Sequence, residues 1–204
     1  MKAQFSRLAV FAGLAAAVAL PASAGTTTYQ IDPRHSSAGF GVTHLMISTV
    51  RGEFHGVNGT VVLDDSDISK SSVNVTIDAT TVDTREPDRD KHLKSDAFFD
   101  VAKYPTITFK STKVEKNADG SLKITGDLTI RGVTKTAVLT ATPPKAPIKD
   151  PWGLQRTAAS AVAKVNRQDF GVAWNQTLDS GGVVVGDDVS ITLDVEMIIP
   201  PAAK

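Results

Sequence analysis

Alternation of apolar and polar residues with a period of two runs through most of this chain, and it predicts β-strands that bury one face. The stretch from Thr84 to Thr112 is the exception. In it, Pro87 suits a first helical position, and Asp88 and Asp90 would lie in the first turn, at the positive end of the helix dipole. We therefore expect one helical insertion, at about residues 86–99, in an otherwise all-β chain.

The apolar side of this insertion consists of Leu93, Phe98 and Phe99. As an alternative to one long helix, Ser95 and Asp96 could cap a second short turn that carries the two phenylalanines. In both cases a single apolar patch stands among many strands and must be buried against them. We expect the insertion to cap one opening of the sheet structure.

A long predicted strand, from Thr49 to Leu63, contains Gly52, Gly56 and Gly59. Glycines at such spacing occur where a sheet bends sharply or where another backbone approaches closely. About eight strands are predicted in total, near the number at which a closed barrel can enclose one small ligand. The expected fold class is all-β, a closed antiparallel barrel of about eight strands, with a sandwich as the alternative.

The N-terminal pattern is typical of a cleaved secretory signal peptide over residues 1–24. Basic residues come first, an apolar run extends from Leu8 to Leu20, and Ala22–Ala24 are small. This run is shorter than the roughly 20 residues that a membrane-spanning helix needs. We expect export to the periplasm, a single domain at residues 25–204, and no stable membrane span after cleavage.

Composition excludes several classes of function. The chain has 22 Lys and Arg residues against 22 Asp and Glu residues, and it has no Cys. Without a basic field, no nucleic-acid partner is expected. The lack of Cys excludes thiol catalysis and thiolate metal sites. Nucleotide-binding and EF-hand motifs are missing as well, so no cofactor is expected. The oligomeric state, a homodimer included, stays open.

Histidines and arginine–aspartate pairs are the candidates for chemistry. The spacing of the four histidines matches no metal-binding motif, so no metal site is expected; they are His35, His44, His55 and His92. Arg89 with Asp90 and Arg167 with Asp169 read as structural ion pairs or as donors to a ligand's phosphate or carbonyl group. One alternative function is therefore a periplasmic enzyme that uses His35 and His44 with these pairs. Another is a structural or stress-response protein without a ligand.

Six motifs, in order along the chain, resemble the YceI family of periplasmic, lipocalin-like proteins that bind isoprenoid lipids. They are IDPRHSSAGFGVTH from Ile31, RGEFHGVNGTV from Arg51, RDKHLKSDAFFDVAKYPTITFKS from Arg89, GDLTIRGVTK from Gly126, NRQDFGV from Asn166 and VGDDVSITLDVEMI from Val185. The resemblance implies a lipocalin-like antiparallel barrel with a helix at one opening. It also implies a polyisoprenoid ligand.

The expected function is that of an exported carrier or storage protein, not an enzyme. It would hold an isoprenoid or similar long-chain lipid, such as a polyprenyl quinone or phosphate, inside the barrel. The polar head would stay at the mouth, near His35, Arg89 or Arg167. The residues expected to contact the ligand are Phe40, Val42, Phe54, Val75, Ile77, Leu93, Phe98, Phe99, Ile107, Phe109, Leu128, Ile130, Phe170 and Trp174.

Cleavage after Ala24 is the first testable consequence. The mature chain should begin at Gly25, because the small residues that precede it suit signal peptidase. The intact mass of protein recovered from the periplasmic fraction measures this directly. Recovery of the uncut chain in the inner membrane would contradict it.

Overall fold

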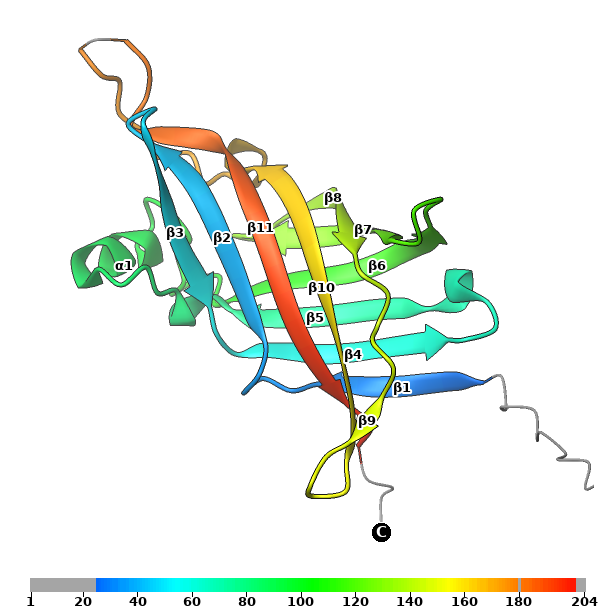
Figure 1. Ribbon diagram of the computed structural model, residues 1–204. Helices are drawn as coiled ribbons and strands as arrows, with labels where there is room; N and C mark the ends of the chain where they lie inside the picture. Colours follow the sequence, from blue (N-terminus) through cyan, green and yellow to red (C-terminus); the bar gives the residue numbers. More distant parts are fainter. Residues whose placement is uncertain (1–24, 180, 201–204) are drawn as a thin grey trace, which may run out of the picture.

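Strands that lie far apart in the sequence form one antiparallel sheet that closes on itself (Figure 1). The structure is a computed structural model, and it describes residues 25–179 and 181–200. The predicted signal peptide lies outside the described residues. The strands are β1 (Thr26–Ile31), β2 (Ser37–His44), β3 (Ser48–Phe54), β4 (Val57–Asp64), β5 (Ser72–Asp78), β6 (Thr106–Lys116), β7 (Leu122–Ile130), β8 (Val133–Ala141), β9 (Ile148–Lys149), β10 (Gln155–Asn166) and β11 (Val185–Ile198).

The barrel closes where β10 pairs with β11 over the whole length of β10, from Arg156 opposite Ile198 to Asn166 opposite Asp188. The closed ring runs through β11, β1, β4, β5, β6, β7, β8 and β10 and returns to β11. Strands β2 and β3 extend the sheet from the other edge of β11, and the short β9 lies beside β10. The predicted all-β, lipocalin-like barrel of about eight antiparallel strands is confirmed.

The glycine-containing run from Thr49 to Leu63 is two strands and not the single long strand expected. Strand β3 pairs with β2, whereas β4 pairs with β1 and β5. The chain turns between them at Gly56, whose φ of +65° favours glycine. At Gly59 another backbone does approach closely, because an added Cβ would lie 2.1 Å from the carbonyl oxygen of Asn74.

Alternation along each strand separates an apolar inner face from a polar outer face. In β7, Leu122, Ile124 and Leu128 are buried, whereas Lys123 and Asp127 are exposed. Because successive side chains of a strand point to opposite faces, one face of every strand in the ring lines the barrel interior.

The predicted helical insertion lies between β5 and β6 and contains α1 (Pro87–Lys94), the one α-helix in the described part of the chain. The expected helical insertion over residues 86–99 is longer than the helix itself, because α1 ends at Lys94 and is capped by Ser95, whose backbone N–H donates to the carbonyl oxygen of His92. Phe98 and Phe99 follow on turns, as the alternative with a second turn anticipated. Glu86 caps the helix, and its carboxylate accepts hydrogen bonds from the first-turn N–H groups.

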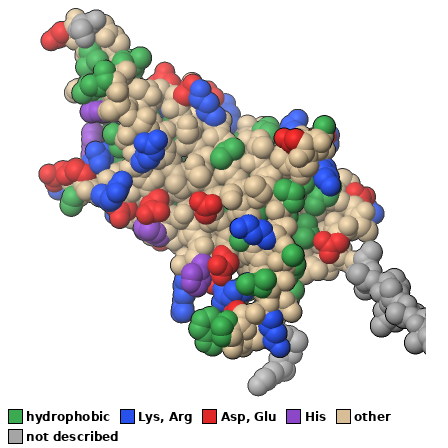
Figure 2. Space-filling view, viewed as in Figure 1, with side chains coloured by type: hydrophobic (Ala, Val, Ile, Leu, Met, Phe, Trp, Pro, Cys, Tyr) green, Lys and Arg blue, Asp and Glu red, His purple; other side chains and the backbone are tan. Residues whose placement is uncertain are grey.

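Three short 3₁₀ helices complete the fold: η1 (Ile68–Lys70), η2 (Ala79–Thr81) and η3 (Arg167–Phe170). No helix in the described ranges is long and apolar enough to cross a bilayer. On the face shown in Figure 2, acidic and basic side chains are interspersed, without a large field of one sign.

Candidate ligand-binding cavity

A cavity of about 410 Å³ occupies the barrel interior. Its lining is almost wholly apolar and comes from all eight strands of the ring, from β2 and β3, and from the insertion that contains α1. The volume lies in the range typical of small-molecule sites, roughly 300 to 1,000 Å³. The interior is therefore open, and the bulky side chains of the barrel do not fill it.

Every residue expected from the sequence to contact a ligand borders this cavity; contact with a ligand stays a prediction. The fourteen residues are Phe40, Val42, Phe54, Val75, Ile77, Leu93, Phe98, Phe99, Ile107, Phe109, Leu128, Ile130, Phe170 and Trp174.

Sequence reasoning missed the contribution of β10 and β11 to the lining. Ala159, Ala161 and Ala163 of β10 face the cavity, and small side chains there leave space in the interior. The inner face of β11 borders it as well, with Val189 and Ile191 among its residues. Period-two alternation in both segments was the available signal.

Aromatic side chains cover one end of the cavity. Phe98, from the insertion, lies with its ring centroid 5.3 Å from that of Trp174, and the ring of His92 meets both edge to face, at 4.9 and 5.1 Å. Phe99 packs edge to face on Phe54 of β3 at 5.4 Å. These spacings are typical of favourable aromatic pairs. The insertion therefore caps one opening, as predicted.

The insertion is fastened to the barrel on two sides. The backbones of Glu53 in β3 and Asp83 exchange two hydrogen bonds of 2.9 Å. Arg131, after β7, donates to the carbonyl oxygens of Asp96, at 2.7 Å, and of Gly171. The cover is thus hydrogen-bonded to both halves of the sheet.

Arg167 borders the cavity but has no donor left for a ligand, so the structure does not support it as a head-group residue. Its side chain is buried, and burial lowers the pKa of Arg167, which the charge of Asp187 partly opposes. All five guanidinium N–H donors are used within the protein. The acceptors are the carbonyl oxygens of Gly186 (2.8 Å), Val172 (2.6 Å), Trp174 (2.9 Å) and Val185 (3.2 Å), and Oδ1 of Asp187 (3.1 Å).

Arg89, in contrast, keeps donors at the covered end of the cavity. Its Nε donates to Oγ1 of Thr84 at 2.7 Å and its Nη2 to the carbonyl oxygen of Thr84 at 2.9 Å. Thr84 is buried and is itself held by Asp90, which accepts from its N–H and its hydroxyl. Nη1 of Arg89 has no hydrogen-bond partner among the described residues. The guanidinium is therefore fixed in place with donors to spare.

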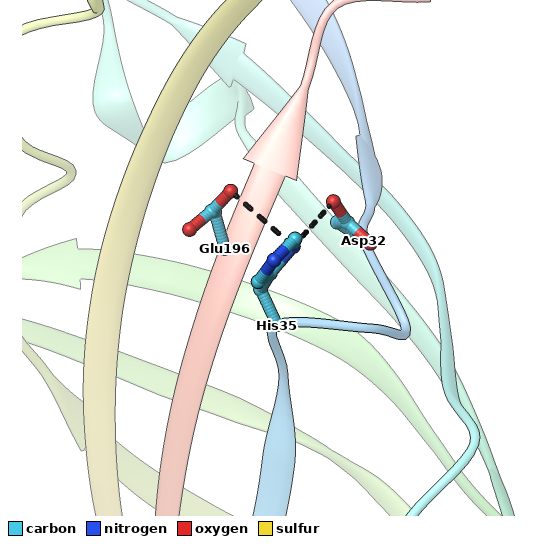
Figure 3. Close-up of side chains that lie close together, drawn as sticks. All are labelled: Asp32, His35 and Glu196. Carbon is cyan, nitrogen blue, oxygen red and sulfur yellow. Dashed lines mark hydrogen bonds and ion pairs between the residues drawn. The ribbon is translucent and has the colours of Figure 1, made fainter. Parts of the chain in front are cut away.

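His35, the third head-group candidate, is not part of the cavity lining, so the structure does not place it beside a ligand there. It lies in the connection between β1 and β2, where its Nδ1 is 2.9 Å from Oδ2 of Asp32 and 3.8 Å from Oε1 of Glu196 (Figure 3). Glu196 stands near the end of β11, whereas α1, the helix that contains Arg89, lies at the opposite end of the barrel (Figure 1).

The group of Asp32, His35 and Glu196 is held by Arg156, which was not singled out in the sequence. Nη1 of Arg156 lies 2.7 Å from Asp32 and 2.6 Å from Glu196, and Nε lies 2.6 Å from Asp150. Burial acts to raise the pKa of Asp32, but hydrogen bonds from Arg156 and His35 lower it to about 2.

This guanidinium already supplies the positive charge that a metal ion would bring to the carboxylates. Asp32, His35 and Glu196 form the one group among the described residues in which a histidine lies close to two carboxylates. This group lies outside the cavity lining. His44 is at the far end of β2 from it. The enzyme alternative, with His35 and His44 acting together, therefore has no geometric support.

Comparison with known proteins agrees with the barrel. The family model of the YceI-like domain matches residues 29–197. A UPF0312 protein of Vibrio parahaemolyticus is 41% identical over 162 residues, which cover 78% of this chain and 85% of that protein.

Two solved structures show the same fold. The YceI protein of Campylobacter jejuni has 33% identity and a TM-score of 0.63 over 78% of this chain and 90% of its own. A polyisoprenoid-binding domain from Saccharophagus degradans, implicated in plant cell wall breakdown, has 14% identity and a TM-score of 0.59 over 84% of this chain and 98% of its own.

Arg156, with Asp32, Asp150, Glu196 and His35, forms what we call the Arg156 cluster. The contribution of this cluster to the stability of the fold can be tested. Arg156→Met leaves the buried carboxylates of Asp32 and Asp150 without their cation, so at pH 7 we expect the Tm to fall by roughly 5 to 10 °C. The control is Lys164→Met on the same strand, because the ion pair of Lys164 with Asp188 is exposed. It should change the Tm by less than about 2 °C.

The pH dependence of this stabilisation has a definite sign. The folded-state pKa of Asp32 is about 2, below its ordinary value of 3.8, so its stabilising contribution is present above about pH 4 and is lost as the pH falls toward 2. Thermal unfolding at several pH values should show the difference between wild type and Arg156→Met narrowing over this interval. A difference that stays constant down to pH 2 would contradict the assignment.

Proposed function

This chain belongs to the family of YceI-like domains, and we propose that it is a carrier or storage protein that holds an isoprenoid lipid inside its barrel. The observation that carries the proposal is the open apolar cavity, which all eight strands of the ring line. The Saccharophagus domain, which shares the fold, is described as a polyisoprenoid-binding domain. We propose that the ligand is bound non-covalently and released unchanged.

The lining restricts the ligand to a molecule with a long hydrocarbon part. A polar group deep in the barrel would lose its hydrogen bonds to water and find few replacements there. Each buried CH₂ contributes about 0.8 kcal/mol, so one five-carbon isoprene unit supplies roughly 3 to 4 kcal/mol. A few such units offset the entropy lost when a flexible chain is ordered.

The polar head would lie at the covered end, beside Arg89. The unused donors of Arg89 suit a phosphate oxygen or a quinone carbonyl, and Thr84 holds the guanidinium at that place. A ligand with its chain in the barrel and its head at Arg89 is a polyprenyl phosphate or a polyprenyl quinone. Location in the periplasm is part of the proposal and rests on the signal-peptide pattern of residues 1–24.

Filling the cavity tests the proposal. Ala163 of β10 borders the cavity, whereas its neighbour Val162 is 53% exposed on the outer face. Ala163→Phe should reduce the co-purified isoprenoid by roughly tenfold, because the added ring occupies the ligand's space. Val162→Phe adds comparable bulk outside and should leave the amount unchanged. Solvent extraction of the purified proteins followed by mass spectrometry measures both.

Two results of these experiments would contradict the proposal. One is a wild-type protein that carries no isoprenoid and, after delipidation, takes up neither a polyprenyl quinone nor a polyprenyl phosphate from detergent solution. The other is equal uptake by folded Ala163→Phe and Val162→Phe proteins, because the ligand would then lie outside the barrel.

The head group is tested at Arg89. Arg89→Gln removes a charged donor but keeps two N–H groups, so we expect about tenfold weaker binding of a polyprenyl phosphate and a smaller loss for a polyprenyl quinone. Lys91→Gln removes one positive charge from an exposed position on the same helix and serves as the control. Equal losses in the two variants would show only a general effect of charge. Titration of each delipidated protein with each lipid provides the affinities.

A further inference from the structure

A second apolar feature lies outside the cavity, at the turn between β2 and β3. Leu45, Met46 and Ile47 follow one another in this turn and are 36, 60 and 84% exposed. With the neighbouring residues 181–184 they form a projection at one end of the molecule, which we call the apolar tip (Figure 1). Figure 2 shows hydrophobic side chains gathered on this projection. Contiguous exposed apolar residues of this kind mark a contact surface.

The backbone of the turn does not favour these residues. Leu45 has a φ of 50° and Met46 a φ of 62°, a region in which Asn and Gly are preferred and large apolar side chains are costly. Met46 and Ile47 gain less from burial than Leu45, because they are 60 and 84% exposed. Burial therefore accounts for little of the apolar character of Met46 and Ile47, and strain retained at an exposed site points to a function.

The apolar tip is continuous with the end of the cavity. The N–H of Leu45 donates to the carbonyl oxygen of Val184 at 2.8 Å, and a Cβ at Gly182 would lie 3.3 Å from Cγ of Met46. Val184 and His44, on either side of the tip, both border the cavity. The apolar tip thus directly adjoins the cavity lining at the end where the aromatic cover lies.

The apolar tip carries almost no charge. Residues 45–50 carry no charge, and residues 174–186 contain Asp179 but no Lys or Arg. The tip therefore offers apolar contact without attraction to an anionic surface. A long-chain lipid is poorly soluble in water, so it passes most readily between a bilayer and the barrel where the barrel's mouth touches the bilayer.

We propose that the apolar tip inserts into the surface of a lipid bilayer and places the mouth of the cavity against it. The occupant is the bilayer, and the side chains of Leu45, Met46 and Ile47 enter its apolar boundary. This inference rests on the proposed function, because an apolar ligand explains why the mouth meets a membrane.

The other exposed apolar pair, Ile148 and Trp152, provides a matched comparison. These side chains are 66 and 81% exposed on the β9 hairpin, but no residue between 145 and 158 borders the cavity. Lys149 and Asp150 stand between the two apolar residues. Similar apolar exposure is thus present at a place that is not continuous with the cavity.

The test uses a tip variant that relieves strain instead of creating it. Leu45→Asn, Met46→Gly and Ile47→Ser together place Asn-Gly at the two positive-φ positions, so thermal stability should be retained or raised. The control variant is Ile148→Ser with Trp152→Ser. Co-sedimentation of the delipidated mature proteins with phosphatidylcholine vesicles, at low and high salt, measures the partition coefficient.

We expect wild type and control to bind the vesicles equally at both salt concentrations and the tip variant to bind at least about tenfold more weakly. The inference is overturned if wild type does not bind, if the tip variant binds as well as wild type, or if salt abolishes binding. It is also overturned if size-exclusion chromatography shows a wild-type dimer that the tip variant loses, because the tip would then join two copies.

Failure of this inference differs from failure of the proposed function. Uptake of a polyprenyl lipid from detergent solution does not need the tip, so it tests the cavity alone. Transfer of the same lipid from vesicles tests both. A tip variant that takes up lipid from detergent as wild type does, but at least tenfold more slowly from vesicles, supports the two together. Equal transfer rates from vesicles would overturn the role of the tip and leave the cavity in place.

Discussion

The pairing of β10 with β11 is the interaction on which the rest of the structure depends, because it turns an open sheet into a closed ring. An arginine holds each end of this seam. Arg156, at the start of β10, binds Glu196 of β11 together with two carboxylates from outside the seam, and Arg167, directly after β10, binds carbonyl oxygens at the start of β11. Arg167, one of the residues expected to contact a ligand, therefore uses its hydrogen-bond donors to hold the closed ring together.

Closure has a particular cost in this barrel, because the interior is left open. A filled core gains dispersion contacts on all sides of each buried side chain, and a side chain at a cavity wall forgoes part of them. The alanines of β10 increase the space further. The buried apolar side chains of the wall still stabilise the fold, and the continuous hydrogen-bonded ladder and the polar groups at the rim add to this. The two arginine sites are such groups, since they satisfy backbone and carboxylate acceptors that would otherwise be buried without partners.

Local pattern predicted the elements of this fold well, because each strand's alternation is independent of its neighbours. The prediction did not separate β3 from β4, although the phase of the alternation shifts between Phe54 and Val57, which are both buried, where the chain changes partners. The residues that line the cavity could be predicted because alternation assigns each side chain to one face of its strand. In a closed ring, the apolar faces of all strands point to the same interior. The expectation of a head-group role for His35 and Arg167 is a different case. Their surroundings come from residues far away in sequence, such as Glu196 and Gly186, and no periodicity reports which end of a barrel a residue occupies or whether its donors are already used.

The two ends of the barrel differ, and under the proposed function this difference would set the order of events in binding. One end has the aromatic cover, Arg89 and the apolar tip, whereas the Arg156 cluster ties β1, β10 and β11 together at the other. A lipid that enters at the covered end must bring its chain in first and leave its head there. Most of the binding free energy is then gained from the chain, which every ligand of the class shares, before the head meets Arg89. Under the proposed function, affinity would therefore be set by chain length, and discrimination between head groups would rest on the few donors at the mouth.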